Sequence, residues 1–248
     1  MRQRSAVWAL ALAVTLSLLT ATTPAVSQSL AHDAVIQRKV IGHSVKKRPI
    51  VALRLGEPGK RVIVMFAAMH GNETAPSKIL HSLADGPPVH GIDLWVVPTY
   101  NPDGVARHTR QNARGVDLNR NFPYRWVKLR GTYNSGRKPA SEPETRAVMR
   151  FLRKVRPSQI ISFHQPLYGV DTDTKRPAFA RRLARALHLP ATSFDCGGVC
   201  HGTMTGWYNH RFKGSALTVE YNAHPARARM RQRAPKQLIR VLGASRGR

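Results

Sequence analysis

The chain has 248 residues, 42% of them hydrophobic, a composition that is ordinary for a globular protein and sufficient for one sizeable core. Its 40 Lys and Arg stand against 13 Asp and Glu, giving a formal net charge of +27 that concentrates polyanions at the surface. Two cysteines are too few for a zinc ribbon, so that class of small metal-stapled domain is excluded.

The first 27 residues have the build of a secretory signal peptide. Arg2 and Arg4 form a basic start, residues 6–19 are an uncharged apolar run, and Ala25-Val26-Ser27 is a small-x-small cleavage site. The alternative is an uncleaved membrane anchor, but the run is shorter than the ~20 apolar residues that a spanning helix needs. We therefore expect a signal peptide at 1–27, one domain at 28–248 and a secreted or cell-wall-associated bacterial protein. We also expect a monomer with no membrane span once the signal peptide is removed.

The location of the protein determines which polyanions its positive charge would attract. Outside a cell the available polyanions include wall polymers, so we expect association with anionic wall polymers by charge and no specific nucleic acid. A solubilising surface explains the scattered arginines equally well. Cys196 and Cys200 flank a Gly-Gly-Val turn, and an exported chain favours a short disulfide between them over two free thiols.

Strand-like and helix-like segments alternate along the rest of the chain, which predicts an α/β layered fold with a partly parallel sheet. Glu57 to Lys60 reads as a turn, so the two strands that flank it are expected to pair as a hairpin. Ser141 and Glu144 have the spacing of a capping box at the start of a helix. The expected strands are 50–55, 62–67, 92–97, 158–163 and 216–221, and the expected helices are 74–83, 141–155, 177–187, 202–212 and 226–243.

Residues 98–140 contain many glycines and prolines and read as one long loop. A loop of this length inside a domain is usually functional or disordered, and its polar motifs favour function. Asn119 and Arg120 stand in it between apolar and amide neighbours, which suggests a buried setting. An Arg fork there would bind a carboxylate at two points, although a single Arg in so basic a chain is often solvated surface.

His70 and Glu73 follow the expected strand 62–67 almost at once, at the edge of the sheet where α/β proteins bind ligands. Their i, i+3 spacing brings a ring nitrogen and a carboxylate to one point, as half of a zinc site. Alone, the pair is more readily explained as a surface His beside a Glu that starts a helix.

His164 ends the expected strand 158–163, and Glu220 lies within the apolar strand 216–221. Each has an ordinary explanation, as a rim His bonded to a carbonyl or as a Glu paired with one of the many arginines. Together with His70 and Glu73, however, His164 completes a two-His, one-carboxylate shell that leaves a position for water. Glu220, partly desolvated beside that water, would be a general base.

These pieces occur in order and at separations that resemble the M14 zinc carboxypeptidase family. The resemblance rests on residues 69–73, 101–104, 115–122, 163–164 and 218–220 and covers roughly residues 40–225. It implies a three-layer α/β/α sandwich around a twisted mixed sheet. It also implies one Zn²⁺ per chain on His70, Glu73 and His164, with Glu220 as general acid/base.

The resemblance also implies groups that bind substrate. Asn119 and Arg120 would hold the substrate's carboxylate. Arg110 is the preferred match for the arginine that stabilises the transition state, with Arg107 as the competing alignment. The family's mobile Tyr has no match near Cys200, and the candidates to replace it are His201 and Tyr208. Asp171 and Asp173 are the candidates to bind an ammonium group of the substrate.

Within the family, the short length and the signal peptide most resemble members that act on cell-wall peptides. This implies hydrolysis of the amide between γ-D-glutamate and diaminopimelate, through a water activated by the metal. The alternatives are a carboxypeptidase of ordinary peptides, an aspartoacylase-like deacylase and a wall-binding protein without activity.

Overall fold

The computed structural model describes residues 34–194 and 197–247, so the expected signal peptide and Cys196 lie outside the described residues. Within those ranges the chain forms an eight-stranded mixed sheet in the order β1-β2-β5-β3-β6-β9-β7-β8. Its strands are β1 (Val35–His43), β2 (Pro49–Gly56), β3 (Val62–Phe66), β5 (Asp93–Val97), β6 (Gln159–His164), β7 (Gly169–Asp171), β8 (Ala191–Thr192) and β9 (Ser215–Glu220). A small second sheet pairs β4 (Val89–His90) with β10 (Ser245–Arg246).

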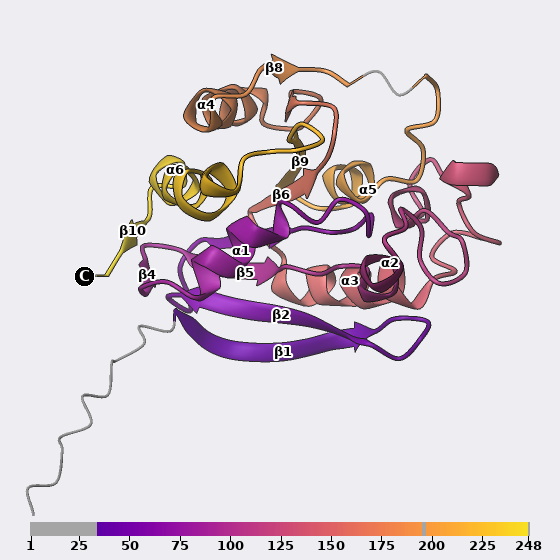
Figure 1. The fold of residues 1–248 in the computed structure, drawn as a ribbon, viewed down its shortest axis with the longest axis horizontal. Helices are drawn as coiled ribbons and strands as arrows, with labels where there is room; N and C mark the ends of the chain where they lie inside the picture. The colour runs from indigo at the N-terminus through magenta and orange to yellow at the C-terminus, as the bar shows by residue number, and fades with distance from the viewer. Residues whose placement is uncertain (1–33, 195–196, 248) are drawn as a thin grey trace, which may run out of the picture. The chain divides into compact units, whose positions relative to one another are not determined.

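The centre of the large sheet is parallel and its flanks are mixed (Figure 1). β5, β3, β6 and β9 run parallel, whereas β2 is antiparallel to β5 and β7 is antiparallel to β9. The expected hairpin of residues 50–55 with 62–67 is wrong, because β5 lies between β2 and β3. β2 instead forms a hairpin with β1, which the sequence did not reveal.

Helices cover both faces of this sheet, so the expected three-layer α/β/α architecture is confirmed. One face carries α1 (Ser77–Ala84), α4 (Pro177–Leu187) and α6 (Ala234–Val241), and α6 contacts both of the others (Figure 1). The other face carries α3 (Pro143–Val155) and α5 (Met204–Arg211). A π-helical turn, η3 (Arg229–Arg233), leads into α6.

The central strands supply a separate apolar face to each helical layer. In β3, Val64 and Phe66 pack toward α3, whereas Ile63 and Met65 pack toward α1. All four side chains are fully buried, which is why the segment reads as an unbroken apolar run and not as an alternating one. In the part of the chain that the structure describes, no helix is both long and apolar enough to cross a bilayer.

The expected capping box at α3 is wrong. The N-cap is Glu142, and no side chain caps the helix. The Ser141 hydroxyl donates to the Glu142 carboxylate, and Glu144 accepts from the backbone amide of Val45 and the side chain of Asn112. These carboxylates therefore tie α3 to the β1–β2 turn and to the long loop.

The long loop of residues 98–140 contains three short helices. They are α2 (Pro102–Arg107), η1 (Leu118–Arg120) and η2 (Gly131–Tyr133). Asn101 caps α2 through its side chain, which accepts from the amide of Gly104. A Cβ on Gly71 would lie 2.0 Å from the carbonyl carbon of Gly104, so only glycine lets these two backbones meet beside His70.

Candidate active site

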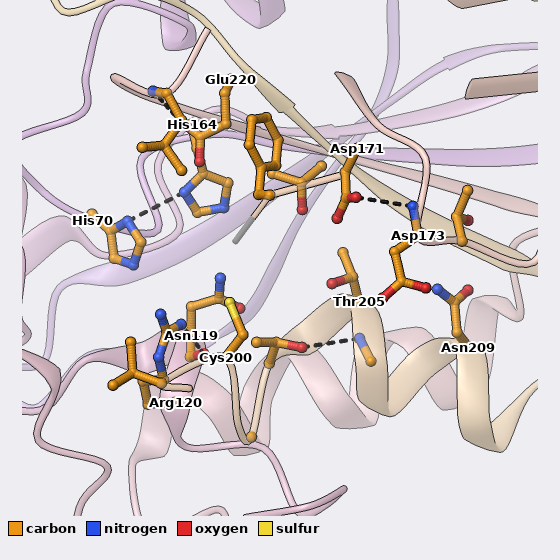
Figure 2. Close-up of a pocket in the computed structure, with 18 of the residues that line it drawn as sticks. His70, Asn119, Arg120, His164, Asp171, Asp173, Cys200, Thr205, Asn209 and Glu220 are labelled. Carbon is orange, nitrogen blue, oxygen red and sulfur yellow. Dashed lines mark hydrogen bonds between the residues drawn. The ribbon is translucent and has the colours of Figure 1, made fainter. Parts of the chain in front are cut away.

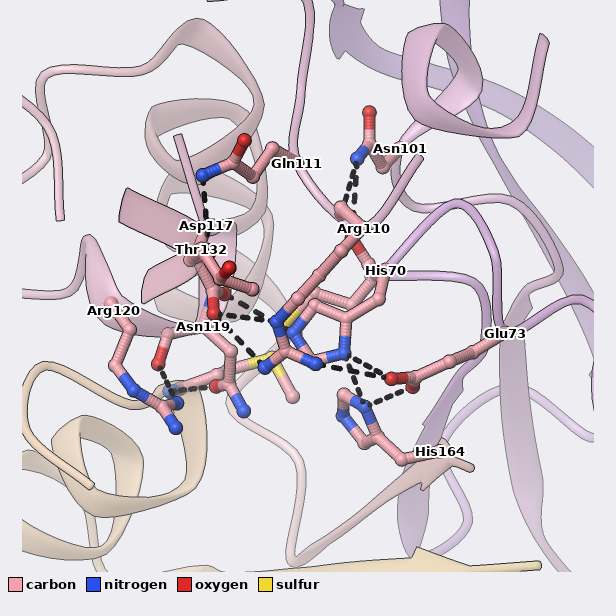
Figure 3. Close-up of polar contacts among 12 residues, drawn as sticks. His70, Glu73, Asn101, Arg110, Gln111, Asp117, Asn119, Arg120, Thr132 and His164 are labelled. Atoms are coloured by element: carbon pink, nitrogen blue, oxygen red, sulfur yellow. Dashed lines mark hydrogen bonds and ion pairs between the residues drawn. The ribbon is translucent and has the colours of Figure 1, made fainter. Parts of the chain in front are cut away.

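Three potential metal ligands converge at the carboxyl ends of β3 and β6. One ligand atom from each of His70, Glu73 and His164 lies within 4.8 Å of the other two, and all three side chains are buried. The Nδ1 atoms of the two His rings are 3.2 Å apart, and each lies 2.7–2.9 Å from a Glu73 oxygen (Figure 3). The predicted trio is therefore assembled at one point.

In both His70 and His164, the second ring nitrogen has a hydrogen-bond partner. Nε2 of His70 is 3.1 Å from Asp117 Oδ1, and Nε2 of His164 is 3.0 Å from Ser162 Oγ. Such outer partners fix the ring and its tautomer, leaving Nδ1 for a metal. A tetrahedral zinc ion with ligands at ~2.0–2.1 Å holds its ligand atoms about 3.3 Å apart. The two Nδ1 atoms are 3.2 Å apart, and each lies nearer to a different oxygen of Glu73. The chemistry of this two-nitrogen, one-carboxylate set therefore fits zinc.

The imidazoles and carboxylates of this cluster shift one another's pKa values. Burial lowers the pKa of His70, but the carboxylates of Glu73 and Asp117 outweigh it and raise that pKa to about 9. Burial raises the pKa of Glu73, but the two His rings hold it well below its usual range. The site is therefore built to hold positive charge among buried carboxylates.

Glu220 stands beside this cluster at the end of β9. It is the register partner of His164 on the neighbouring parallel strand, and both point into the same cleft (Figure 2). Its side chain is buried, and burial raises its pKa above the usual value despite the nearby His164. Its Oε2 accepts a hydrogen bond from the backbone amide of Leu167 at 3.3 Å. A carboxyl group held in this way can exchange a proton with a molecule in the cleft.

Arg110 reaches the cluster and Arg107 does not. The Arg110 guanidinium bonds Asp117 through Nε at 3.0 Å and lies 3.3 Å from Glu73 Oε1 (Figure 3). Arg107 donates instead to the carbonyl of Asn112 and does not line the cleft. Of the two arginines, only Arg110 lies where it could meet a molecule bound at the cluster, and its role in the transition state stays a prediction.

Asn119 and Arg120, on η1, form the wall of the cleft below His70 (Figure 2). Asn119 Oδ1 accepts from the Met204 amide at the start of α5, which leaves its Nδ2 as a donor on the cleft side. The Arg120 side chain is buried, and its Nε has no hydrogen-bond partner. Asn119 and Arg120 therefore bring an amide and a guanidinium to the wall of the cleft, although Nε of Arg120 itself is sealed inside the protein.

The cleft has a volume of about 740 Å³ and extends from the His–Glu cluster to an acidic far end. Figure 2 shows Asp171 and Asp173 there, opposite Thr205 and Asn209 of α5. Among the described residues neither carboxylate has an ion-pair partner, although the chain is strongly basic. The pKa of Asp171 is raised, mainly by burial.

Two predicted substrate-binding residues are placed elsewhere. Tyr208 is fully buried against Trp207 and Phe212, and its hydroxyl donates to the carbonyl of Pro157. His201 does not line the cleft, although its neighbours Cys200 and Gly202 do. Because Cys196 lies outside the described residues, its expected pairing with Cys200 stays a prediction.

Sequence reasoning missed three residues that shape the site. Asp117 bonds both His70 and Arg110, and Ser162 bonds His164. Tyr133 lines the cleft from η2. A signal was available for Asp117, which stands two residues before Asn119 in the same motif, and for Ser162, which shares a strand face with His164. Nothing in the sequence pointed to Tyr133.

Comparison with known proteins places this site in a family. Residues 27–167, more than half of the chain, match the family model described as zinc carboxypeptidase (Peptidase M14). The match includes His70, Glu73 and His164 and ends before Glu220. The chain is 30% identical over 184 residues to murein peptide amidase A of Escherichia coli K12, covering 67% of this chain and 74% of that protein.

Solved structures agree on the fold. The crystal structure of murein-tripeptide amidase from Escherichia coli O157 superposes with a TM-score of 0.68 at 24% identity, covering 83% of this chain and 91% of that one. Carboxypeptidase A from Helicoverpa armigera gives a TM-score of 0.66 at 20% identity, covering 84% and 68%. The fold, the assembled trio and the family match together show that this chain belongs to the zinc carboxypeptidase family and is a hydrolase that acts on peptides.

Proposed function

We propose that the protein is a secreted zinc metallopeptidase that hydrolyses the amide between γ-D-glutamate and diaminopimelate in peptidoglycan peptides. The observation that carries this proposal is a single cleft joining the His70–Glu73–His164 cluster to a carboxylate-binding wall and an acidic far end. Similarity to murein peptide amidases supports the choice of substrate.

The donor set fits one zinc ion per chain, held by His70, Glu73 and His164. Bound there, zinc would supply Lewis acidity that lowers the pKa of a water molecule and polarises a carbonyl group. Asp117 and Ser162 hold the two rings in the tautomers that such binding requires.

Glu220 is the residue that moves protons. Its raised pKa and its place beside His164 suit a group that takes a proton from water and returns it to the leaving amine. Arg110, fixed by Asp117, offers its remaining N–H groups to the carbonyl oxygen as negative charge develops there.

The substrate residue that supplies the amine of the scissile amide, the leaving residue, would be recognised at both of its ends. The Asn119 amide and the Arg120 guanidinium would bind its α-carboxylate, next to the His–Glu cluster. Its side chain would extend toward Asp171 and Asp173, which lack cationic partners among the described residues and would meet an ammonium group. Diaminopimelate carries both groups.

Four further features belong to the proposal. Residues 1–27 would direct export as a signal peptide, leaving 28–248 as the mature single domain. The excess of Lys and Arg would hold the protein near anionic wall polymers. A disulfide between Cys196 and Cys200 would fix the loop beside the cleft. The protein would work as a monomer.

A substrate panel tests the proposed specificity. The mature protein is incubated with a γ-D-glutamyl-diaminopimelate peptide, with ordinary L-peptides and with an N-acyl amino acid, each with and without a chelator. Mass spectrometry should show release of diaminopimelate that the chelator abolishes. Cleavage of L-peptides alone would indicate a general carboxypeptidase, and cleavage of the N-acyl amino acid alone would indicate a deacylase. Either result would contradict the substrate assignment.

A further inference from the structure

Tyr133 lies against both of the arginines that line the cleft. The centroid of its ring is 5.3 Å from Cζ of Arg110 and 5.4 Å from Cζ of Arg120. The residue ends η2, lines the cleft and is 40% exposed. An aromatic face at this distance attracts a guanidinium, so one ring contacts two cations.

The two arginines are held unequally by the rest of the protein. Arg110 has the Asp117 carboxylate at 2.9–3.0 Å from two of its nitrogens. Arg120 has no ion pair within the described ranges, and its guanidinium donates to the carbonyl of its neighbour Asn119. Burial lowers the pKa of Arg120, the nearby Asp117 carboxylate opposes this effect without forming an ion pair, and Arg110 adds to it. The Tyr133 ring is therefore one of the few groups that directly contact the Arg120 guanidinium.

The backbone of the turn that carries the ring is held by several hydrogen bonds. The side chain of Gln111, the residue after Arg110, donates to the carbonyls of Gly131 and Thr132 at 2.7 and 3.1 Å (Figure 3). Asn134 donates to the carbonyl of Gly115, and its own carbonyl accepts from the Asp117 amide. The turn that carries Tyr133 is thus tied to the segments that carry Arg110 and Asp117.

We propose that Tyr133 is a positioning residue whose ring holds Arg120, and secondarily Arg110, in the orientation that binds the carboxylate and the scissile carbonyl of a peptide substrate. This inference rests on the proposed function, because it assigns a substrate carboxylate to Arg120. It adds Tyr133, from the long loop, to the residues that position the substrate, and it assigns this role to the aromatic ring and not to the hydroxyl.

Tyr133→Leu and Tyr133→Phe test this role on two substrates, a γ-D-glutamyl-diaminopimelate peptide with a free α-carboxylate and its α-amide. With the free carboxylate, Tyr133→Leu should raise KM roughly three- to thirty-fold, the range expected for a lost cation–π contact, and lower kcat less. On the α-amide its KM should change little, because Arg120 has no carboxylate to bind. Tyr133→Phe, which keeps the ring, should stay within about twofold of the wild type.

Phe179→Leu is the matched control, since it removes an equally close ring–guanidinium contact, with Arg182 on α4 outside the cleft. Gln111→Leu, which frees the turn without removing the ring, is the second variant and should raise KM in the same direction. An unchanged KM in both Tyr133→Leu and Gln111→Leu would overturn the inference. So would an equal loss in Tyr133→Phe, or a fall in kcat alone on both substrates. Absence of turnover in the wild type would instead overturn the proposed function, and this inference with it.

Discussion

His164 and Glu220 are register partners at the ends of two adjacent parallel strands, β6 and β9. The hydrogen bonds of the sheet therefore set the spacing between a metal ligand and the proposed general acid/base, and loop conformation does not. Side chains at matching positions of neighbouring parallel strands point to the same face. Both residues consequently enter the cleft together, although 55 residues separate them in the chain.

Glu220→Gln should abolish turnover while the site still binds zinc. Glutamine keeps the shape of the side chain but cannot accept the proton, so kcat should fall by about 10²- to 10⁴-fold. Zinc content by atomic absorption should stay at the wild-type value, since Glu220 is not one of the three ligands. Glu57→Gln, at a half-buried glutamate that contacts His90 outside the cleft, is the control. Wild-type kcat in Glu220→Gln would remove this residue from the mechanism.

Asp117→Asn should weaken zinc binding. The Asp117 carboxylate accepts from Nε2 of His70, and loss of such an outer partner commonly costs about 10- to 100-fold in metal affinity. Competition with a chromophoric chelator measures the affinity. Asp93→Asn, which breaks a buried ion pair with Arg54 away from the cleft, is the matched control and should leave the zinc affinity unchanged. If both variants bind zinc like the wild type, Asp117 does not support His70.

Asp171→Asn should alter selectivity among substrates. Removing the charge should raise KM about tenfold for a leaving residue with a side-chain ammonium, because a charge-assisted hydrogen bond is lost. A leaving residue with a neutral side chain should show no change. Asp85→Asn, outside the cleft, is the control. Equal effects on both kinds of substrate would mean that Asp171 supports the fold of the cleft and does not bind the side chain of the leaving residue.

The contact between Asp103 of α2 and the β1–β2 turn should make the free energy of unfolding depend on pH. Burial raises the pKa of Asp103, but hydrogen bonds from the Lys46 amide and the Arg48 guanidinium outweigh it and hold that pKa below its ordinary value. The stabilisation from the ionised carboxylate is then fully present above the unfolded-state pKa of about 3.9 and is lost as pH falls through the lower folded-state pKa.

Asp103→Asn should accordingly be less stable than the wild type by about 1–3 kcal/mol at pH 7, and the difference should shrink as the pH falls below the unfolded-state pKa of about 3.9. Urea denaturation of the chelator-treated proteins at several pH values measures it. A difference that stays constant across that range would show that the charge of Asp103 does not contribute.

The sequence predicted the site residues that lie at the ends of strands or directly after them. Residues 62–67 and 158–163 are apolar runs, and a chain that leaves such buried parallel strands must emerge at one edge of the sheet. His164, at the end of β6, and the turn after β3 that carries His70 and Glu73 are therefore brought to the same edge. The same rule could not order the strands. Residues 50–55 and 62–67 are joined by a short turn, yet β5 inserts between them, and only tertiary packing decides that.

Other features escaped prediction because their partners are distant in sequence. Glu144 has the spacing of a capping residue, but Val45 and Asn112 bind its carboxylate in the folded protein. β1 lies at the edge of the sheet and consists of exposed and half-buried residues without regular alternation, so its sequence carries no clear strand pattern. Tyr133 belongs to a loop whose course is set by side-chain-to-backbone hydrogen bonds, which leave no periodic pattern.

Zinc titration of the metal-free protein, with hydrolysis of the γ-D-glutamyl-diaminopimelate peptide measured at each addition, tests whether His70, Glu73 and His164 form the catalytic zinc site. Activity should be absent without metal, rise in proportion to added zinc and level off at one equivalent per chain. In His70→Ala and His164→Ala the same additions should restore little activity. Hydrolysis that persists in the metal-free protein, or full activity in either His variant, would contradict the assignment of His70, Glu73 and His164 as the catalytic zinc site.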